Sequence, residues 1–253
     1  MINKGMEFTK AEFPFQAQMP LSFRNVSKSY GKNVAVKGLN IEIKNGEKVA
    51  LLGENGAGKS TTLKIISGLM RPDAGYVRIY GQLPSSLSAK QHIGYLPEDP
   101  SPYLNLSVRE NLEYIGAIRQ TRNLETRVDD LIYHLQLKNY EKQKPLSLSR
   151  GNKQKLCLAL SIIHEPSFCV MDEPLNYLDI PTQEIIFQYF ESMNSSFIIS
   201  THILSIARRL TERIIIISSG TKIWDGKLAE LEEMERTGKS MENVVSELMK
   251  NVP

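Results

Sequence analysis

The residues best suited to chemistry form the run Gly53-Glu54-Asn55-Gly56-Ala57-Gly58-Lys59-Ser60-Thr61. This run fits the pattern G-x-x-x-x-G-K-[ST] of a phosphate-binding loop. Its glycines let the backbone turn around a triphosphate with the N–H groups pointing inward, and the following helix presents its positive end. Lys59 can reach the β- and γ-phosphates, and Ser60 can ligate Mg²⁺. The loop predicts binding of a nucleoside triphosphate and leaves its purpose open.

The flanks of this loop have the order that such a site requires. Residues 49–52 are an apolar, strand-like run, and residues 62–69 carry apolar side chains at helical spacing. Strand, loop and helix are the context of a phosphate-binding loop. The alternative is a glycine-rich turn with a chance Gly-Lys-Ser, and these flanks disfavour it.

Two acids end another apolar strand. The run at 168–171 is followed by Asp172 and Glu173. Because ligands bind at the carboxyl ends of the strands in a parallel sheet, we expect Asp172 beside the phosphate loop, holding Mg²⁺ directly or through water. Glu173 is placed to polarise an attacking water as general base. The alternative is a strand that ends in a solvated Asp-Glu pair, which the upstream loop disfavours.

The elements around these groups predict a mainly parallel sheet covered by helices. Residues 21–43 alternate as strands do and predict a small antiparallel sheet. Residues 107–137 predict an all-helical insertion that begins at the capping box Ser107-Val108-Arg109-Glu110. The further elements expected are strands at 76–80, 93–96, 197–200, 214–217 and 221–224, helices over 156–163, 182–193 and from about 203, and a polar, helical C-terminal segment.

Composition narrows the class of protein. The 253 residues are 41% hydrophobic and 23% charged, which is ordinary for a globular chain. The longest purely aliphatic block is 214–217, so we expect no membrane crossing. Residues 1–20 lack the apolar core of a secretory signal, which makes cytoplasmic residence the default.

Cys157 and Cys169 lack the spacing of metal ligands and predict buried packing. The net charge of +3 is scattered along the chain, so no nucleic-acid partner is expected.

Taken in order, these motifs closely resemble the nucleotide-binding subunit of ATP-binding cassette (ABC) transporters, over about residues 21–227. The most specific match after the loop is Leu148-Ser149-Arg150-Gly151-Asn152-Lys153-Gln154, which is similar to the family signature L-S-x-G-x-x-Q. The resemblance implies an α/β fold: a P-loop NTPase (RecA-like) core with an N-terminal antiparallel β-subdomain and an inserted α-helical subdomain. It also implies the boundaries of an ABC ATPase domain at 21–230 with the insertion at about 98–148, an N-terminal extension at 1–20 and a C-terminal helical tail at 231–253.

The signature makes chemical sense as a second phosphate clamp. The Ser149 hydroxyl and the Gly151 N–H stand at the start of an apolar helix, where the helix dipole favours an anion. The resemblance implies that this surface faces the nucleotide of a partner subunit, so that two chains enclose two ATP molecules. The alternative, an ordinary Ser-capped helix, explains the two residues but not the order of motifs around them.

The resemblance assigns roles to further residues. It implies that Tyr30 stacks on adenine, the alternative being an exposed tyrosine at a strand end. It implies that His202 is the switch histidine that touches the γ-phosphate, and that Asp179 belongs to the loop that crosses the dimer interface. All nine loop residues are expected to contact ATP.

The chain also departs from the family pattern. Glu98 stands where glutamine is usual, and a carboxylate there can still reach Mg²⁺ or water. Arg150 replaces a more usual glycine, and Asn176-Tyr177 is bulkier than the small residues common there. These departures leave nucleotide binding intact and make the turnover rate less certain. Some exporter-type branches of the family tolerate the glutamate and the altered signature, which favours export.

The resulting hypothesis is an ATPase subunit of an ABC transporter that uses ATP and Mg²⁺. It is expected to work as a homodimer or heterodimer on separate integral membrane permease subunits, at the inner face of the cell membrane, with residues 98–144 as the docking face. One alternative is a soluble ABC ATPase acting on nucleic acid or ribosomes, which is disfavoured because the chain has neither two cassettes nor a long coiled coil. Another is a regulator that holds ATP but barely hydrolyses it.

Overall fold

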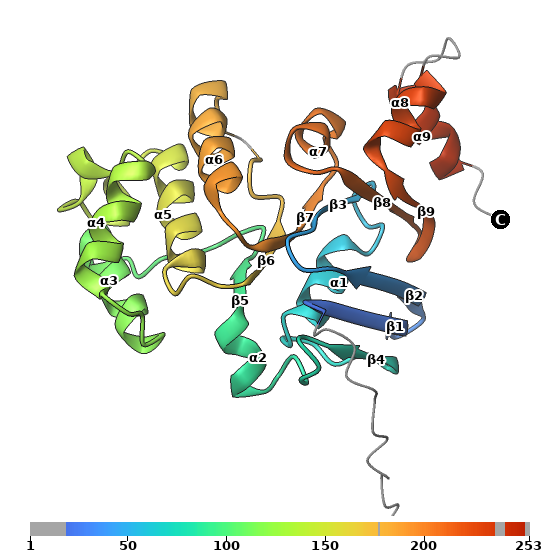
Figure 1. Ribbon diagram of the computed structural model, residues 1–253, viewed down its shortest axis with the longest axis horizontal. Helices are drawn as coiled ribbons and strands as arrows, with labels where there is room; N and C mark the ends of the chain where they lie inside the picture. Colours follow the sequence, from blue (N-terminus) through green and yellow to red (C-terminus); the bar gives the residue numbers. More distant parts are fainter. Residues whose placement is uncertain (1–18, 177, 236–240, 251–253) are drawn as a thin grey trace, which may run out of the picture.

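Six strands build the central sheet, in the order β5-β6-β7-β3-β8-β9 (Figure 1). The computed structural model of the chain describes residues 19–176, 178–235 and 241–250. Neighbouring strands from β5 to β8 are parallel, and β9 runs antiparallel to β8. The strands are β3 Lys48–Leu52, β5 Ile93–Leu96, β6 Phe168–Asp172, β7 Ser196–Thr201, β8 Arg213–Ser218 and β9 Thr221–Lys227.

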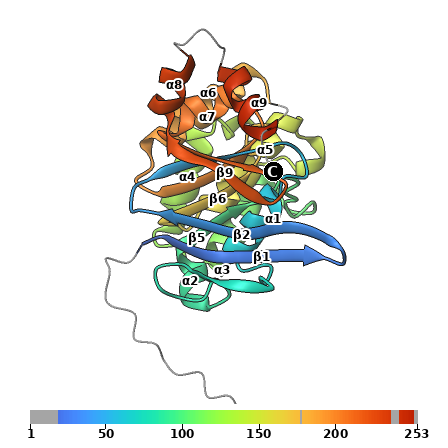
Figure 2. The same ribbon diagram turned by 90° about the vertical axis from the view of Figure 1, so that its right-hand side faces the viewer.

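One face of this sheet is covered by helix α1 and a smaller antiparallel sheet. The smaller sheet has the order β2-β1-β4, and α1 packs between it and the central strands. In the turned view of Figure 2, β1 and β2 lie below the central sheet, whereas α8 and α9 lie above it. The elements of this layer are β1 Leu21–Tyr30, β2 Asn33–Ile43, β4 Ala74–Arg78, α1 Lys59–Ile66 and the short helix α2 Leu87–His92.

The other face is covered by helices. Alternate residues of a strand point to opposite faces, so Val49 and Leu51 pack on the α1 side while Ala50 and Leu52 pack on the α7 side. Apolar runs of this kind are typical of strands buried on both faces. The remaining elements are α3 Val108–Ile118, α4 Leu124–His134, α5 Arg150–Ile162, α6 Ile180–Ser192, α7 Leu204–Leu210, α8 Leu228–Glu235, α9 Met241–Lys250 and the 3₁₀ turns Lys138–Tyr140 and Pro145–Ser147.

The predicted fold class is confirmed, with local differences. The capping box forms as expected, because Ser107 accepts from the N–H of Glu110 and the Glu110 carboxylate accepts from the N–H of Ser107. Helix α1 begins at Lys59, three residues before the apolar pattern starts, because the loop itself ends in a helical turn. Strand β4 ends at Arg78 rather than at residue 80, where Tyr80 has a φ of +46°. Cys157 and Cys169 are buried and free, as expected.

Within the described residues, no helix is long and apolar enough to cross a membrane. The residues of the predicted N-terminal extension lie almost entirely outside the described part of the chain, as do residues 236–240 and 251–253 of the predicted C-terminal tail. The elements that position the chemistry are therefore the loop after β3 and the chain that leaves β5, β6 and β7.

Candidate nucleotide-binding site

The phosphate-binding loop connects β3 to α1 at the carboxyl end of the central sheet. Gly56 and Gly58 have φ values of +85° and +101°, in the region that favours glycine. A Cβ atom on Gly58 would lie 2.2 Å from the carbonyl oxygen of Ala35 in β2. The N–H of Gly220 donates to the carbonyl of Ala57 at 3.0 Å and holds the loop from the β8–β9 turn. Packing against two other segments therefore fixes the shape of the loop.

A cavity of about 380 Å³ opens beside this loop, within the size range of ligand sites. It brings together residues that lie far apart in the sequence. The exposed ring of Tyr30 stands at one side and Glu173 at another. The full lining is Tyr30, residues 33–35, 54–56 and 58–61, Glu98 and Glu173. Most of the predicted nucleotide-binding residues thus share one cavity.

Lys59 lies at the buried end of the loop, and only 6% of its surface is exposed. Its Nζ donates to the carbonyl oxygens of Gly53 at 2.8 Å and Glu54 at 3.3 Å. The same nitrogen lies 3.5 Å from Oε1 of Glu173. The ammonium group of Lys59 is therefore already positioned at the loop, and largely removed from water, before a phosphate binds.

Glu173 is held in an unusual conformation with one carboxylate oxygen free. Its φ is +47°, and its N–H donates to the hydroxyl of Ser200 at 3.0 Å. Oε1 lies 3.0 Å from Nδ1 of His202. Oε2 is buried and has no hydrogen-bond partner among the described residues. A buried oxygen without a donor is unfavourable, and a general base needs such an oxygen to take the proton of a water.

Asp172, the residue before Glu173, is the last residue of β6 and is only 1% exposed. Its Oδ1 accepts a hydrogen bond from the hydroxyl of Ser200. Ser200 therefore orients both acids, through the side chain of Asp172 and through the N–H of Glu173. This role of Ser200 was not predicted from the sequence. The available signal was a serine two residues before His202 at the end of an otherwise apolar strand.

His202 directly follows β7. Besides its contact with Glu173, it lines a neighbouring cavity of about 580 Å³ together with Gly53, Glu54 and Asn55. Helix α9 closes this cavity through Val245 and Ser246. The histidine thus lies within reach of both the loop and the second acid.

The remaining predicted residues stand apart from the cavity in the described part of the chain. Ser149 accepts from the N–H of Asn152 at 3.3 Å and caps α5. Asp179 accepts from the N–H of Thr182 at 2.9 Å and caps α6, and the hydrogen bonds from Thr182 hold the pKa of Asp179 below its ordinary value. Gly151 lies near the side chain of Thr182. One chain alone does not bring these groups to its own phosphate loop.

A link nevertheless joins the signature helix to the acids. Nε2 of Gln154 in α5 donates to the carbonyl of Pro174, the residue after Glu173, at 3.0 Å. Asn176 donates its N–H to the carbonyl of Glu173 at 3.2 Å. Tyr177, the bulky residue noted in the sequence, lies outside the described residues.

A phosphate-binding loop at the carboxyl end of a parallel sheet, with one acid at the end of β6 and a second acid directly after it, defines the class of P-loop ATPases. Comparison with known proteins narrows this class. Residues 36–176 match the family model described as ABC transporter. Nod factor export ATP-binding protein I of Burkholderia orbicola (strain AU 1054) is 36% identical over 225 residues, which cover 85% of this chain and 73% of that protein. ABC transporter ATP-binding protein NatA of Bacillus subtilis (strain 168) is 31% identical over 211 residues, covering 80% and 86%.

Solved structures agree with the sequence relatives. A structure described as the ATP binding subunit of an ABC transporter superposes with a TM-score of 0.82 at 28% identity, over 90% of this chain and 98% of that one. The dimeric ATP-binding cassette MJ0796, in a post-hydrolysis state bound to ADP and Pi, has a TM-score of 0.76 at 28% identity, over 82% and 98%. The chain belongs to the ABC transporter family as an ATP-binding subunit, and its enzyme class is that of an ATPase.

Proposed function

We propose that this chain binds Mg²⁺–ATP in the cavity beside the phosphate loop and hydrolyses it with Glu173 as general base. The observation that carries the proposal is the buried, unpartnered Oε2 of Glu173 next to Lys59. A carboxylate in this position accepts a proton from a water at the γ-phosphate, while the ammonium group offsets phosphate charge. His202 holds the opposite oxygen of the same carboxylate and reaches the γ-phosphate from the second cavity.

The rest of the cavity suits the nucleotide. The loop N–H groups and the start of α1 bind the phosphates. The ring of Tyr30, which is 48% exposed, offers a face on which adenine stacks. Its hydroxyl donates to Sδ of Met70 at 3.1 Å, which fixes the ring beside the cavity.

Ser60 and Asp172 would hold Mg²⁺, with Glu98 at the edge of the cavity as a third oxygen ligand. The described residues contain no cluster of three or more His, Cys, Asp or Glu side chains suited to a metal. A hydroxyl with one or two carboxylates suits Mg²⁺, which takes one or two carboxylates and completes its shell with substrate phosphates and water. When bound, the ion neutralises negative charge on the phosphates.

The second half of the site comes from another subunit in this proposal. Ser149 and Gly151 open α5, where the N–H groups favour an anion, yet they lie outside the cavity of their own chain. A homodimer or heterodimer would place them over the partner's ATP, with Asp179 at the interface. The relative MJ0796 is described as dimeric in two solved structures.

Transport is the use that we infer for this ATPase. Separate permease subunits would carry the substrate, docked on residues 98–144 of the helical insertion, with the chain at the inner face of the cell membrane. Export is the favoured direction, since the 36% identical relative from Burkholderia orbicola is named an export protein. The substrate would be selected by the permease.

The test is the substitution Glu173→Gln, which keeps the shape of the side chain and removes its basicity. We expect ATP hydrolysis to fall by about 10²–10⁴-fold while ATP affinity stays within about threefold of the parent. Glu113→Gln, an exposed change on α3, is the matched control and should hydrolyse at the parent rate. Parent-like hydrolysis by Glu173→Gln would remove Glu173 from the role of general base.

A further inference from the structure

One hydroxyl at the edge of the site is buried and has no partner. Tyr95 lies in β5, and its ring packs against the apolar cluster around α1. Its Oη is shielded from solvent and has no hydrogen-bond partner among the described residues. Phenylalanine would fill the same space without burying an unsatisfied hydroxyl, which is unfavourable. The group is therefore suited to a partner that arrives with a ligand.

The sheet register places Tyr95 near the metal end of β6, on the same face of the sheet. In the parallel pair β5–β6, Tyr95 lies opposite Val170. Both pack in the cluster around α1, on one face of the sheet. Residues two apart share a face, so Asp172 projects on that same face, just beyond Val170.

The electrostatics of the hydroxyl agree with this placement. Burial raises the pKa of Tyr95 to about 12, and the negative charge of Asp172 contributes to the rise. The hydroxyl therefore stays protonated at neutral pH and is able to donate. No direct hydrogen bond joins it to Asp172, whose Oδ1 is taken by Ser200.

We propose that the Tyr95 hydroxyl is a positioning group of the Mg²⁺–nucleotide site, where it hydrogen-bonds a water held at the Asp172 carboxylate. This inference rests on the proposed function, because it requires Mg²⁺ and nucleotide at Asp172. It also gives a role to the chain that leaves β5, since Glu98 lines the cavity three residues after Tyr95. Strand β5 and the segment that follows it thus reach the site at two places, Tyr95 near the charge of Asp172 and Glu98 at the cavity wall.

The experiment is calorimetric titration of the full chain with the non-hydrolysable ATP analogue AMPPNP, in EDTA and in excess Mg²⁺. In Tyr95→Phe, we expect the Mg²⁺-dependent gain in affinity to shrink about fivefold, the size of one hydrogen bond. The affinity in EDTA should stay within about twofold of the parent, and the melting temperature should not fall. The matched control is Tyr80→Phe, because the Tyr80 hydroxyl donates to the carbonyl of Ser167, away from the acids, at 3.2 Å.

The titrations distinguish a failure of the Tyr95 inference from a failure of the proposed Mg²⁺–ATP site. An unchanged Mg²⁺-dependent gain in Tyr95→Phe, or an equal loss of affinity with and without Mg²⁺, overturns the inference and makes Tyr95 a packing residue. Either result leaves the proposed function standing. If the parent protein shows no Mg²⁺-dependent gain at all, the proposed metal site fails and the inference fails with it.

Discussion

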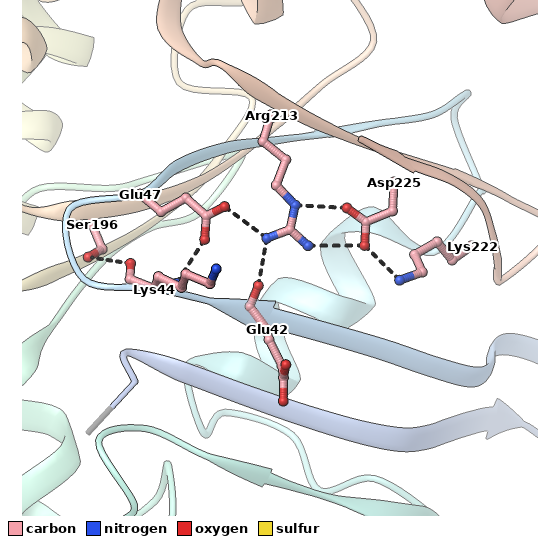
Figure 3. Close-up of polar contacts among 7 residues, drawn as sticks. All are labelled: Glu42, Lys44, Glu47, Ser196, Arg213, Lys222 and Asp225. Atoms are coloured by element: carbon pink, nitrogen blue, oxygen red, sulfur yellow. Dashed lines mark hydrogen bonds and ion pairs between the residues drawn. The ribbon is translucent and has the colours of Figure 1, made fainter. Parts of the chain in front are cut away.

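Both ends of the central sheet carry charged side chains that are partly or fully buried, but the hydrogen bonds and ion pairs of these side chains differ between the two ends. At the amino end, Arg213 of β8 donates to both carboxylate oxygens of Asp225 in β9, at 2.8 and 3.0 Å (Figure 3). Its third nitrogen donates to the carbonyl of Glu42 at 2.8 Å and to the carboxylate of Glu47 at 3.0 Å. Lys222 adds a further bond to Asp225 at 2.7 Å. This network joins β2, β8 and β9, and each of its charges has an opposite charge beside it.

At the carboxyl end, the polar groups are incompletely paired. Glu173 Oε2 and Tyr95 Oη are buried without partners in the described part of the chain. Lys59 donates to two carbonyls of its own loop and lies near Glu173. Glu173 also has a positive φ, which is unfavourable for a side chain of this kind.

This difference in pairing indicates that the amino end of the sheet stabilises the fold and that the carboxyl end binds the ligand. In the network at the amino end, every charge has a partner without ligand. This network holds the strands in register, and nucleotide binding adds no interaction to it. Groups that are buried and unsatisfied gain partners only when a ligand arrives, and such groups cluster at functional sites. Substitutions at the two ends should therefore affect different quantities: ATP binding or hydrolysis at the carboxyl end and stability at the amino end.

The largest effect is expected from Lys59→Ala. Removing the ammonium group deletes a charge-assisted bond to phosphate, so ATP affinity should fall about 100-fold, or about 3 kcal/mol. Isothermal titration calorimetry measures the affinity. Lys64→Ala, an exposed change in the same helix, is the control and should bind as the parent does. Unchanged affinity in Lys59→Ala would contradict the assignment of the phosphate loop.

At the opposite end, Asp225→Asn should lower the free energy of unfolding at pH 7 by about 2 kcal/mol, because Arg213 loses one of its two carboxylate partners. Urea denaturation measures this loss. ATP affinity should stay within about twofold of the parent. A loss of ATP affinity in Asp225→Asn as large as that in Lys59→Ala would contradict the conclusion that the amino-end network affects stability and not nucleotide binding.

The same substitution has a defined pH dependence. Burial works to raise the pKa of Asp225, but hydrogen bonds from Arg213 and Lys222 outweigh it and hold the pKa below its ordinary value of 3.8. The stabilisation is then fully present above pH 3.8 and is lost as the pH falls through the lowered pKa. The stability difference between parent and Asp225→Asn should be constant from neutral pH to about 4 and shrink below that. A difference that closes near pH 6 would assign it to another group.

The smallest effect is expected from Tyr30→Ala. An aromatic stacking contact contributes about 1 kcal/mol, so ATP should bind about fivefold more weakly. Tyr133→Ala, at a more exposed tyrosine of α4, is the control and should leave the affinity unchanged. An equal affinity for the parent and Tyr30→Ala would make Tyr30 an exposed strand-end tyrosine with no part in the site.

Much of the fold was predictable from local patterns. The apolar strand before Asp172 and the capping box at Ser107 were identified because each signal lies within a few consecutive residues. The phosphate loop was identified in the same way. Helix α2 was missed because it has six residues, too few to show a periodicity.

The rest depends on contacts between segments distant in sequence. Ser200 reaches Asp172 only because β6 and β7 are parallel and in a particular register. The free hydroxyl of Tyr95 is defined by the packing around α1, not by its neighbours along the chain. Asp179 was assigned to dimer communication, whereas within one chain it caps α6, and that assignment stays a prediction.

Whether ATP is enclosed between two copies of this chain is tested by the mass of Glu173→Gln in solution, measured by light scattering with and without Mg²⁺–ATP. If the exposed phosphate loop is half of a site completed by the signature of a second copy, the variant should be monomeric without nucleotide. With ATP it should have twice the 28.6 kDa mass of one chain. A variant that binds ATP with parental affinity and remains a monomer at saturating nucleotide would contradict the account.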